Sequence, residues 1–175
     1  MKGYWIGLCL AVLPVVALAE APTVRRDSTA ILANGQTIVK AHSAMWSVKV
    51  IFKTHTVNIG KPSDALPSHR IWPCTYSRYP CSPVDHLTIS VNGKALYVPP
   101  IVLFGLADVN TAELRLTAKA VTLVLTGGDA SEAYITRITF DRRHVRRVTW
   151  APGEASDQIL QETIFHYLPA NYFNH

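Results

Sequence analysis

The Asn92-Gly93 pair constrains the fold of this chain more than any other feature of its sequence. It stands between two segments in which apolar and polar residues alternate. Asn-Gly in such a setting is the strongest short-range signature of a β-hairpin, because both turn residues need a positive φ. We therefore predict a hairpin over residues 86–98, and with it an antiparallel sheet.

Further short alternating segments predict an all-β chain. Residues 46–57 are β-branched and aromatic, and Val48, Val50 and Phe52 alternate with more polar positions. The other predicted strands span residues 37–41, 112–117, 120–126, 132–140, 145–150 and 158–167. The alternation within 132–140 is imperfect, which predicts a bulge or a switch of face. Turn residues separate the strands, so we expect a single antiparallel sandwich or a partly closed barrel of about eight strands.

Two segments interrupt this strand pattern. Residues 58–86 contain five prolines, and proline removes a backbone donor, so we predict a long irregular loop there. Residues 100–108 are apolar and begin at a proline, which favours either one or two helical turns or an apolar crossover.

The N-terminus has the three zones of a secretory signal peptide. Lys2 precedes an uncharged apolar stretch, and Ala17-Leu18-Ala19 gives the small-x-small pattern of a cleavage site. The stretch is shorter than the roughly 20 residues that span a bilayer, which argues against an uncleaved anchor. We predict a signal peptide at residues 1–19, a tail at 20–35 and one β domain at 36–175. The mature protein would be periplasmic or secreted.

Cleavage would leave two cysteines, Cys74 and Cys81, both inside the long loop. An even number of cysteines in an oxidising compartment favours a disulfide. A redox pair or a zinc site is the alternative, although the spacing is not C-x-x-C and no nearby ligands complete a metal site. The formal net charge of +5, which includes Lys2, does not indicate nucleic acid binding.

The disulfide loop is the first candidate binding surface. Aromatic and arginine side chains on a rigid exposed loop are the residue types that dominate protein–protein contacts. The alternative is that the same aromatic rings cover one end of the core. The loop candidates are Arg70, Trp72, Tyr76, Arg78 and Tyr79.

An arginine cluster is the second candidate surface. Arg142, Arg143, Arg146 and Arg147 occupy a predicted turn and the start of the next strand. They would suit an acidic partner, a lipid headgroup or an anionic glycan. The alternative is a solvated turn and a charged sheet edge that discourages pairing with other chains.

No motif predicts catalysis, a metal site or a cofactor. The Gly127-Gly128 turn lacks the Lys-Ser/Thr and the following helix of a phosphate-binding loop. There is no Gly-x-Ser-x-Gly elbow, and the seven histidines have no metal-ligand spacing. Pairs of carboxylates for glycoside hydrolysis are not excluded, but nothing in the sequence pairs them.

Several short motifs resemble small exported β-rich proteins of Gram-negative bacteria that have no assigned function. These motifs are Val91-Asn92-Gly93, Leu106-Ala107-Asp108, Gly127-Gly128-Asp129-Ala130-Ser131 with Tyr134, and Phe140-Asp141. The resemblance covers roughly residues 86–167, consists largely of turn motifs, and implies an envelope location without assigning a functional residue.

These observations together predict a non-enzymatic binding module of the cell envelope. The expected partner is an envelope protein or an anionic glycan, with no nucleic acid and no membrane span after cleavage. Two alternatives stay open: a hydrolase acting on glycan or peptidoglycan, and a structural envelope component. The sequence does not indicate the oligomeric state.

Overall fold

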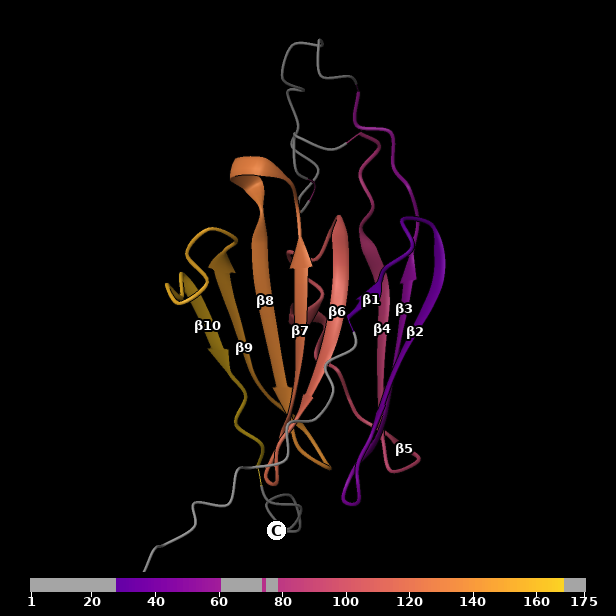
Figure 1. The fold of residues 1–175 in the computed structure, drawn as a ribbon, viewed down its shortest axis with the longest axis vertical. Helices are drawn as coiled ribbons and strands as arrows, with labels where there is room; N and C mark the ends of the chain where they lie inside the picture. Colours follow the sequence, from indigo (N-terminus) through magenta and orange to yellow (C-terminus); the bar gives the residue numbers. More distant parts are fainter. Residues whose placement is uncertain (1–27, 61–73, 75–78, 169–175) are drawn as a thin grey trace, which may run out of the picture.

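The computed structural model describes residues 28–60, 74 and 79–168 of the chain. They form two antiparallel β-sheets, as Figure 1 shows, so the predicted all-β fold is confirmed as a sandwich. The signal peptide at 1–19 lies outside the described residues. Within the described part of the chain, no helix is long and apolar enough to cross a membrane.

The smaller sheet has four strands that follow one another in the sequence. They are β2 (Gly35–His42), β3 (Ser47–Thr54), β4 (Val84–Val91) and β5 (Lys94–Ala95), in that spatial order. The predicted hairpin joins β4 to β5, and Asn92 and Gly93 have φ values of 50° and 81°. Both turn residues therefore adopt the positive φ that the Asn-Gly pair predicts.

The larger sheet has six strands in the order β1-β6-β7-β8-β9-β10. Their bounds are β1 (Thr29–Ala30), β6 (Val109–Leu116), β7 (Val121–Gly127), β8 (Tyr134–Phe140), β9 (Val145–Pro152) and β10 (Gln161–Ile164). From β6 onward the sheet is a continuous meander, whereas β1 comes from the opposite end of the sequence. The two sheets therefore differ in width by two strands.

Side chains from the facing sides of the two sheets form one hydrophobic core. Val50, Phe52 and Ile89 from the small sheet pack with Leu123, Leu125 and other residues of the large sheet. These side chains are fully buried because strand alternation directs every second residue between the layers. The core lies where the four-stranded sheet faces the large sheet.

Several predicted boundaries differ from the structure. The segment predicted as a tail, 20–35, contributes β1, and Ile31 enters the core. The last strand is shorter than the predicted 158–167, because it pairs with β9 over four residues only. The bulge or switch of face predicted in 132–140 is absent, because β8 alternates regularly; the register shift opposite Thr139 and Phe140 places the extra residue, Arg146, on β9.

The segment 100–108 combines the two predicted forms, a helical turn and an apolar crossover. A 3-10 helix, η1 (Pro100–Val102), begins at Pro100 and ends after one turn. Leu103 and Phe104 continue the turn, and Gly105 leaves it with a φ of 94°. The segment then crosses to the large sheet and enters β6. A second short 3-10 helix, η2 (Ala130–Glu132), connects β7 to β8.

Candidate functional site

The inner face of the large sheet is less covered toward β9 and β10, because this sheet is two strands wider than the small sheet. One row of cross-strand partners shows how burial changes across the sheet. Leu125 of β7 pairs with Thr136, Thr136 with Trp150, and Trp150 with Gln161. Leu125 is fully buried, Trp150 is half-buried and Gln161 is exposed. Cover is therefore lost progressively toward β10.

The segment containing η1 lies opposite this less covered face. Val102 and Leu106 are buried in the core and anchor the segment to the sandwich. Ile101 and Phe104 project from it, and Phe104 is 65% exposed. The segment therefore closes one side of the space above β8–β10 without filling it.

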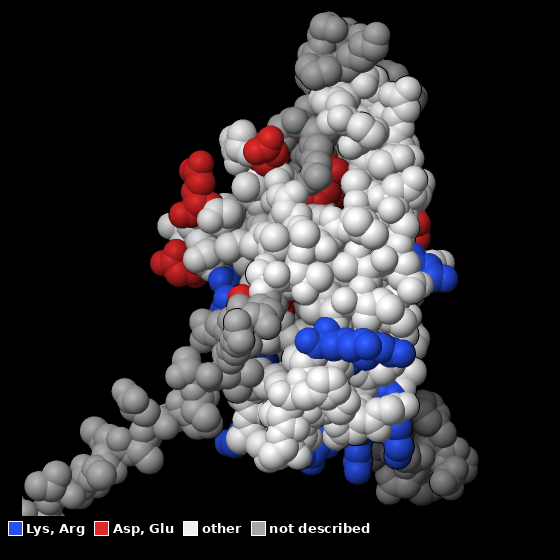
Figure 2. All heavy atoms as spheres, turned by 45° about the vertical axis from the view of Figure 1, so that its right-hand side comes forward, with Lys and Arg blue, Asp and Glu red and all other residues white. Residues whose placement is uncertain are grey.

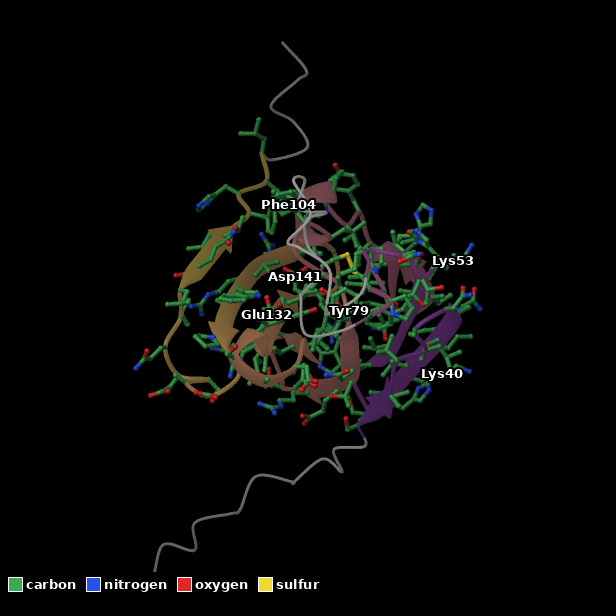
Figure 3. The ribbon with its side chains drawn as sticks, turned by 90° about the horizontal axis from the view of Figure 1, so that it is seen from above. Lys40, Lys53, Tyr79, Phe104, Glu132 and Asp141 are labelled. Atoms are coloured by element: carbon green, nitrogen blue, oxygen red, sulfur yellow. A yellow bond between two sulfur atoms is a disulfide. The ribbon has the colours of Figure 1, made fainter. Side chains whose placement is uncertain are left out.

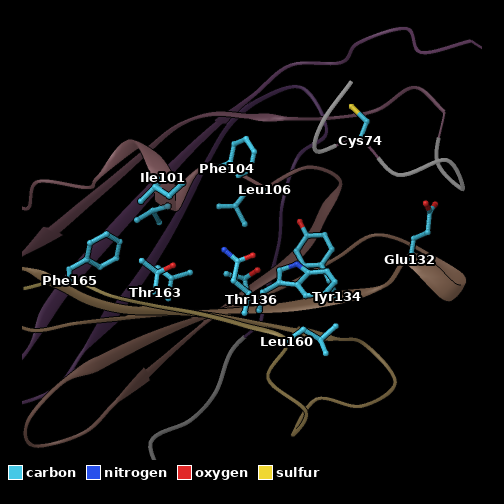
Figure 4. Close-up of a pocket in the computed structure, with 15 residues that line it drawn as sticks. Cys74, Ile101, Phe104, Leu106, Glu132, Tyr134, Thr136, Leu160, Thr163 and Phe165 are labelled. Carbon is cyan, nitrogen blue, oxygen red and sulfur yellow. The ribbon is translucent and has the colours of Figure 1, made fainter. Parts of the chain in front are cut away.

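A cavity of about 370 Å³ lies between the segment containing η1 and the inner face of β8–β10, and Figure 4 shows its walls. Phe104 and Leu160, each 65% exposed, stand on opposite sides of it. The volume is within the range of roughly 300–1,000 Å³ typical of small-molecule sites. The lining residues are Cys74, Ile101, Val102, Phe104, Gly105, Leu106, Glu132, Tyr134, Thr136, Val148, Trp150, Leu160, Gln161, Thr163 and Phe165. Most of them are apolar or aromatic.

Tyr134 and Trp150 form a fixed aromatic wall of the cavity. Their ring planes are 22° apart and their centroids 6.0 Å apart. The Tyr134 hydroxyl donates to the backbone oxygen of Ala107 at 2.6 Å, so the ring is held at both ends. A Cβ at Gly127 would collide with the Tyr134 ring, which explains the glycine at that position. This wall does not need a ligand to hold its shape.

Thr136 places an unpaired hydroxyl on the cavity wall. The residue is 2% exposed, and its Oγ1 makes no hydrogen bond. A buried polar group without a partner typically costs about 1–3 kcal/mol, so buried hydroxyls are nearly always paired. The fold therefore leaves this hydroxyl without a partner beside the cavity, and because its oxygen has almost no exposed surface, a molecule in the cavity would have to displace part of the wall to reach it.

Only one carboxylate, that of Glu132, belongs to the described residues that line the cavity. Glycoside hydrolysis needs two carboxyl groups that face one another across the substrate. The cavity therefore lacks, among its described residues, the feature that would favour the hydrolase interpretation. No group of three histidine, cysteine or acidic side chains within the described ranges could hold a metal ion.

The predicted disulfide between Cys74 and Cys81 is present, with a Cα–Cα distance of 5.6 Å. Cys81 is fully buried and exchanges two backbone hydrogen bonds with Val57, whereas Cys74 lines the cavity. The buried Asp108 accepts a hydrogen bond from the backbone of Ser82 at 2.8 Å. The disulfide therefore ties a wall of the cavity to the body of the sandwich.

Most of the predicted loop candidates cannot be placed. Arg70, Trp72, Tyr76 and Arg78 lie outside the described residues. Tyr79 is half-buried and precedes the disulfide cysteine by two positions. Whether this loop binds a partner therefore stays a prediction, although its Cys74 contacts the cavity.

The four candidate arginines differ in the contacts that they make. Arg142 and Arg143 lie in the β8–β9 turn, and Arg142 stacks over the Trp46 ring at 5.1 Å. Arg146 pairs with Asp141, and Arg147 with Glu162 of β10. Since β9 is an interior strand, Arg146 and Arg147 do not protect a sheet edge, and that alternative is wrong for them.

Asp141 organises the β8–β9 turn. Partial burial opposes its ionisation, but hydrogen bonds from Arg143 N, from the Arg146 guanidinium and from His144 N outweigh it. The three donor–acceptor distances are 2.7, 2.6 and 2.8 Å. Together these bonds hold the pKa of the Asp141 carboxyl below its usual range.

One residue of the sequence, Thr136, could have indicated the cavity, but the irregular alternation of the segment 132–140 obscured it. The apolar residues of 132–140, among them Ile135 and Ile138, do not alternate regularly, and for this reason we predicted a bulge or a switch of face. In β8 the buried positions alternate regularly, so Thr136 points inward with Ile138 and Ile135 points outward. A buried polar residue is an informative exception in a strand. Thr136 at an inward position of β8 is therefore the sequence feature that could have indicated the site.

Comparison of the chain with protein-family models, with curated proteins and with solved structures finds no match. The resemblance to exported Gram-negative proteins therefore stays a prediction.

Proposed function

We propose that the protein is a non-enzymatic binding module of the cell envelope that holds a small, mainly apolar molecule in the cavity beside β8–β10. The observation that carries this proposal is the unpaired Thr136 hydroxyl on the wall of a preformed apolar cavity. A ligand with one donor or acceptor group would satisfy this hydroxyl and would bury its remaining surface against aromatic and aliphatic side chains.

Two further features support the proposal. Tyr134 is fixed by its hydrogen bond and its stacking, so a ligand would meet a wall that is already ordered. The disulfide stabilises the side of the cavity that Cys74 lines, and a disulfide is typical of exported proteins. Export through the segment at residues 1–19 is part of the proposal.

Titration with the neutral fluorophore N-phenyl-1-naphthylamine tests the cavity as a binding site. We expect saturable binding and a change in Trp150 fluorescence that a Trp150→Phe variant lacks. Val148→Phe adds bulk inside the cavity, and overpacking of this kind costs about 1–3 kcal/mol, so the affinity should fall about tenfold. Ile135→Phe adds comparable bulk on the outer face of β8 and is the matched control.

Equal affinity in the Val148→Phe and Ile135→Phe variants would show that the probe binds elsewhere and would contradict the proposal. Thr136→Val then tests the hydroxyl. We expect this variant to bind the amine-bearing probe about fivefold more weakly, because about fivefold is the contribution of one hydrogen bond. Its affinity for a hydrocarbon analogue of the probe should not change. The same substitution at Thr149, a buried residue on the other face of β9, should change neither affinity.

A further inference from the structure

One end of the sandwich, opposite η2, is built from four turns that are tied together. Figure 1 shows the β2–β3, β4–β5, β6–β7 and β8–β9 turns at this end. Trp46 Nε1 donates to the backbone oxygen of Thr117 at 2.7 Å, and the guanidinium of Arg142 lies over the Trp46 ring. Asn92 Oδ1 accepts from the backbone of Ser47 at 2.7 Å. Contacts from two side chains, Trp46 and Asn92, thus join turns of both sheets into one surface.

Exposed cations stand on this surface. Lys119, Arg142 and Arg143 come from two of the four turns, Lys94 begins β5 directly after a third, and Lys40 and Lys49 lie beside them on β2 and β3. We call these six residues the basic end. Among the described residues of the four turns, Asp141 is the only acid, and the turn backbone and Arg146 already occupy its carboxylate.

Lys40 and Lys49 are direct cross-strand partners on the outer face of the small sheet. Like charges in this position are unfavourable, and neither lysine forms an ion pair with a described residue. Folding alone therefore gives no reason for the pair. Figure 3, seen from above, places Lys40 at the outer side of the small sheet.

Acidic side chains gather at the other end of the molecule. Asp129 and Glu132 lie at η2, and Glu154 and Asp157 lie in the β9–β10 connection. Figure 2 shows the same separation, with Asp and Glu mainly in the upper half of this face and Lys and Arg mainly below. A charge distribution of this kind orients a protein end-on toward an anionic surface.

Met45 adds an apolar group among the cations. It occupies the tip of the β2–β3 turn and is 46% exposed, although Trp46 beside it is buried. An apolar side chain surrounded by lysine and arginine suits the boundary between lipid headgroups and hydrocarbon, where both kinds of group find partners.

We propose that the basic end docks on the surface of an anionic lipid bilayer. The cations are spread over projecting turns rather than gathered around one point, which matches the diffuse negative charge of a lipid surface. A soluble acidic polymer would satisfy the cations but would leave Met45 without a partner. The proposal is independent of the ligand in the cavity, because none of its residues lines that site.

Sedimentation of the purified protein with vesicles tests the proposal. We expect binding to vesicles that contain two parts phosphatidylcholine to one part phosphatidylglycerol, weaker binding as salt is added, and no binding to phosphatidylcholine alone. Each cation near an anionic surface is worth about fivefold in affinity, so Lys94→Gln with Lys119→Gln should weaken binding roughly 25-fold. Met45→Ser should weaken binding to vesicles but not binding to dextran sulfate.

Lys53→Gln with Arg137→Gln is the matched control, since it removes the same charge away from the basic end. It should change vesicle binding by less than about twofold. Equal weakening by both double variants would show a bulk charge effect and would overturn the proposal. Binding to dextran sulfate without binding to anionic vesicles would overturn it as well, in favour of a soluble polyanion.

Discussion

In both halves of the large sheet the side chains alternate between the inner and the outer face, but the two halves differ in what lies opposite the inner face. Leu123 of β7 and Val148 of β9 both point to the inner face, and both pair with Ile138 of β8. Leu123 is fully buried beneath the small sheet, whereas Val148 is half-buried at the cavity. The local strand pattern decides which face a side chain takes, and the width of the partner sheet decides whether that face is covered.

This difference assigns separate roles to the two halves. The covered half, β6 and β7 against β2–β4, contributes most of the buried apolar surface and with it the stability. The half from β8 to β10, which opens at β9 and β10, retains apolar surface and the unpaired Thr136 hydroxyl that the fold itself does not satisfy. A group that weakens the free protein but can be satisfied by a ligand is typical of a binding site.

The largest expected effect on stability comes from shortening one inward-pointing side chain in each half to alanine. Leu123→Ala should lower the free energy of unfolding by about 2–5 kcal/mol, because the side chain is fully enclosed. Val148→Ala on the same face should lower it by about 1 kcal/mol or less, since the side chain is already partly exposed. Urea denaturation of both variants measures the difference.

Equal losses of unfolding free energy in the two variants would contradict this comparison between the covered and the open half. They would mean that the inner face of β9 is covered in solution, either by a co-purified molecule or by a part of the chain outside the described residues. Mass spectrometry of the native protein distinguishes these two explanations.

An intermediate effect concerns the open half alone. Thr136→Val removes a buried hydroxyl that has no partner, so it should raise the free energy of unfolding by about 1 kcal/mol. Thermal unfolding of the ligand-free protein measures it. A loss of stability would show that the hydroxyl is already paired, for example by an ordered water, and would remove the main support for a ligand site.

The smallest effect concerns the turn that joins β8 to β9. The folded pKa of Asp141 lies below its unfolded value of about 3.9, so its stabilisation is complete at neutral pH. It is lost as the pH falls through the folded pKa. Asp141→Asn should therefore be less stable than the wild type at pH 7, by less than about 1 kcal/mol, and the difference should vanish in acid. Unfolding curves across the acid range would reveal any pH-independent difference, which would contradict this account.

Local chemistry predicted much of the fold. The Asn92-Gly93 turn, the alternating strands and the disulfide depend on residues that are close in the sequence, and the structure confirms each of them. Strand ends were less predictable, because β10 ends where its pairing with β9 ends rather than where its own pattern stops.

The candidate site could not be predicted in the same way. The cavity unites segments near residues 74, 101–106, 132–136, 148–150 and 160–165. Their proximity follows from the unequal widths of the sheets, which no local pattern encodes. Trp46 is a second example, since it bonds to a residue 71 positions away and thereby joins two turns that the sequence treats as unrelated.

The short strand β1 has a consequence for how the chain assembles. Apart from β1, each sheet is a single uninterrupted block of sequence, so its strands can pair with near neighbours in chain order. Thr29 and Ala30 pair instead with Ala112 and Thr111, and this contact closes a loop that contains the whole small sheet. Closing this long loop costs more chain entropy than pairing strands that are neighbours in the sequence, which favours early formation of the two local blocks. We therefore expect β1, the first strand in the described part of the chain, to pair last.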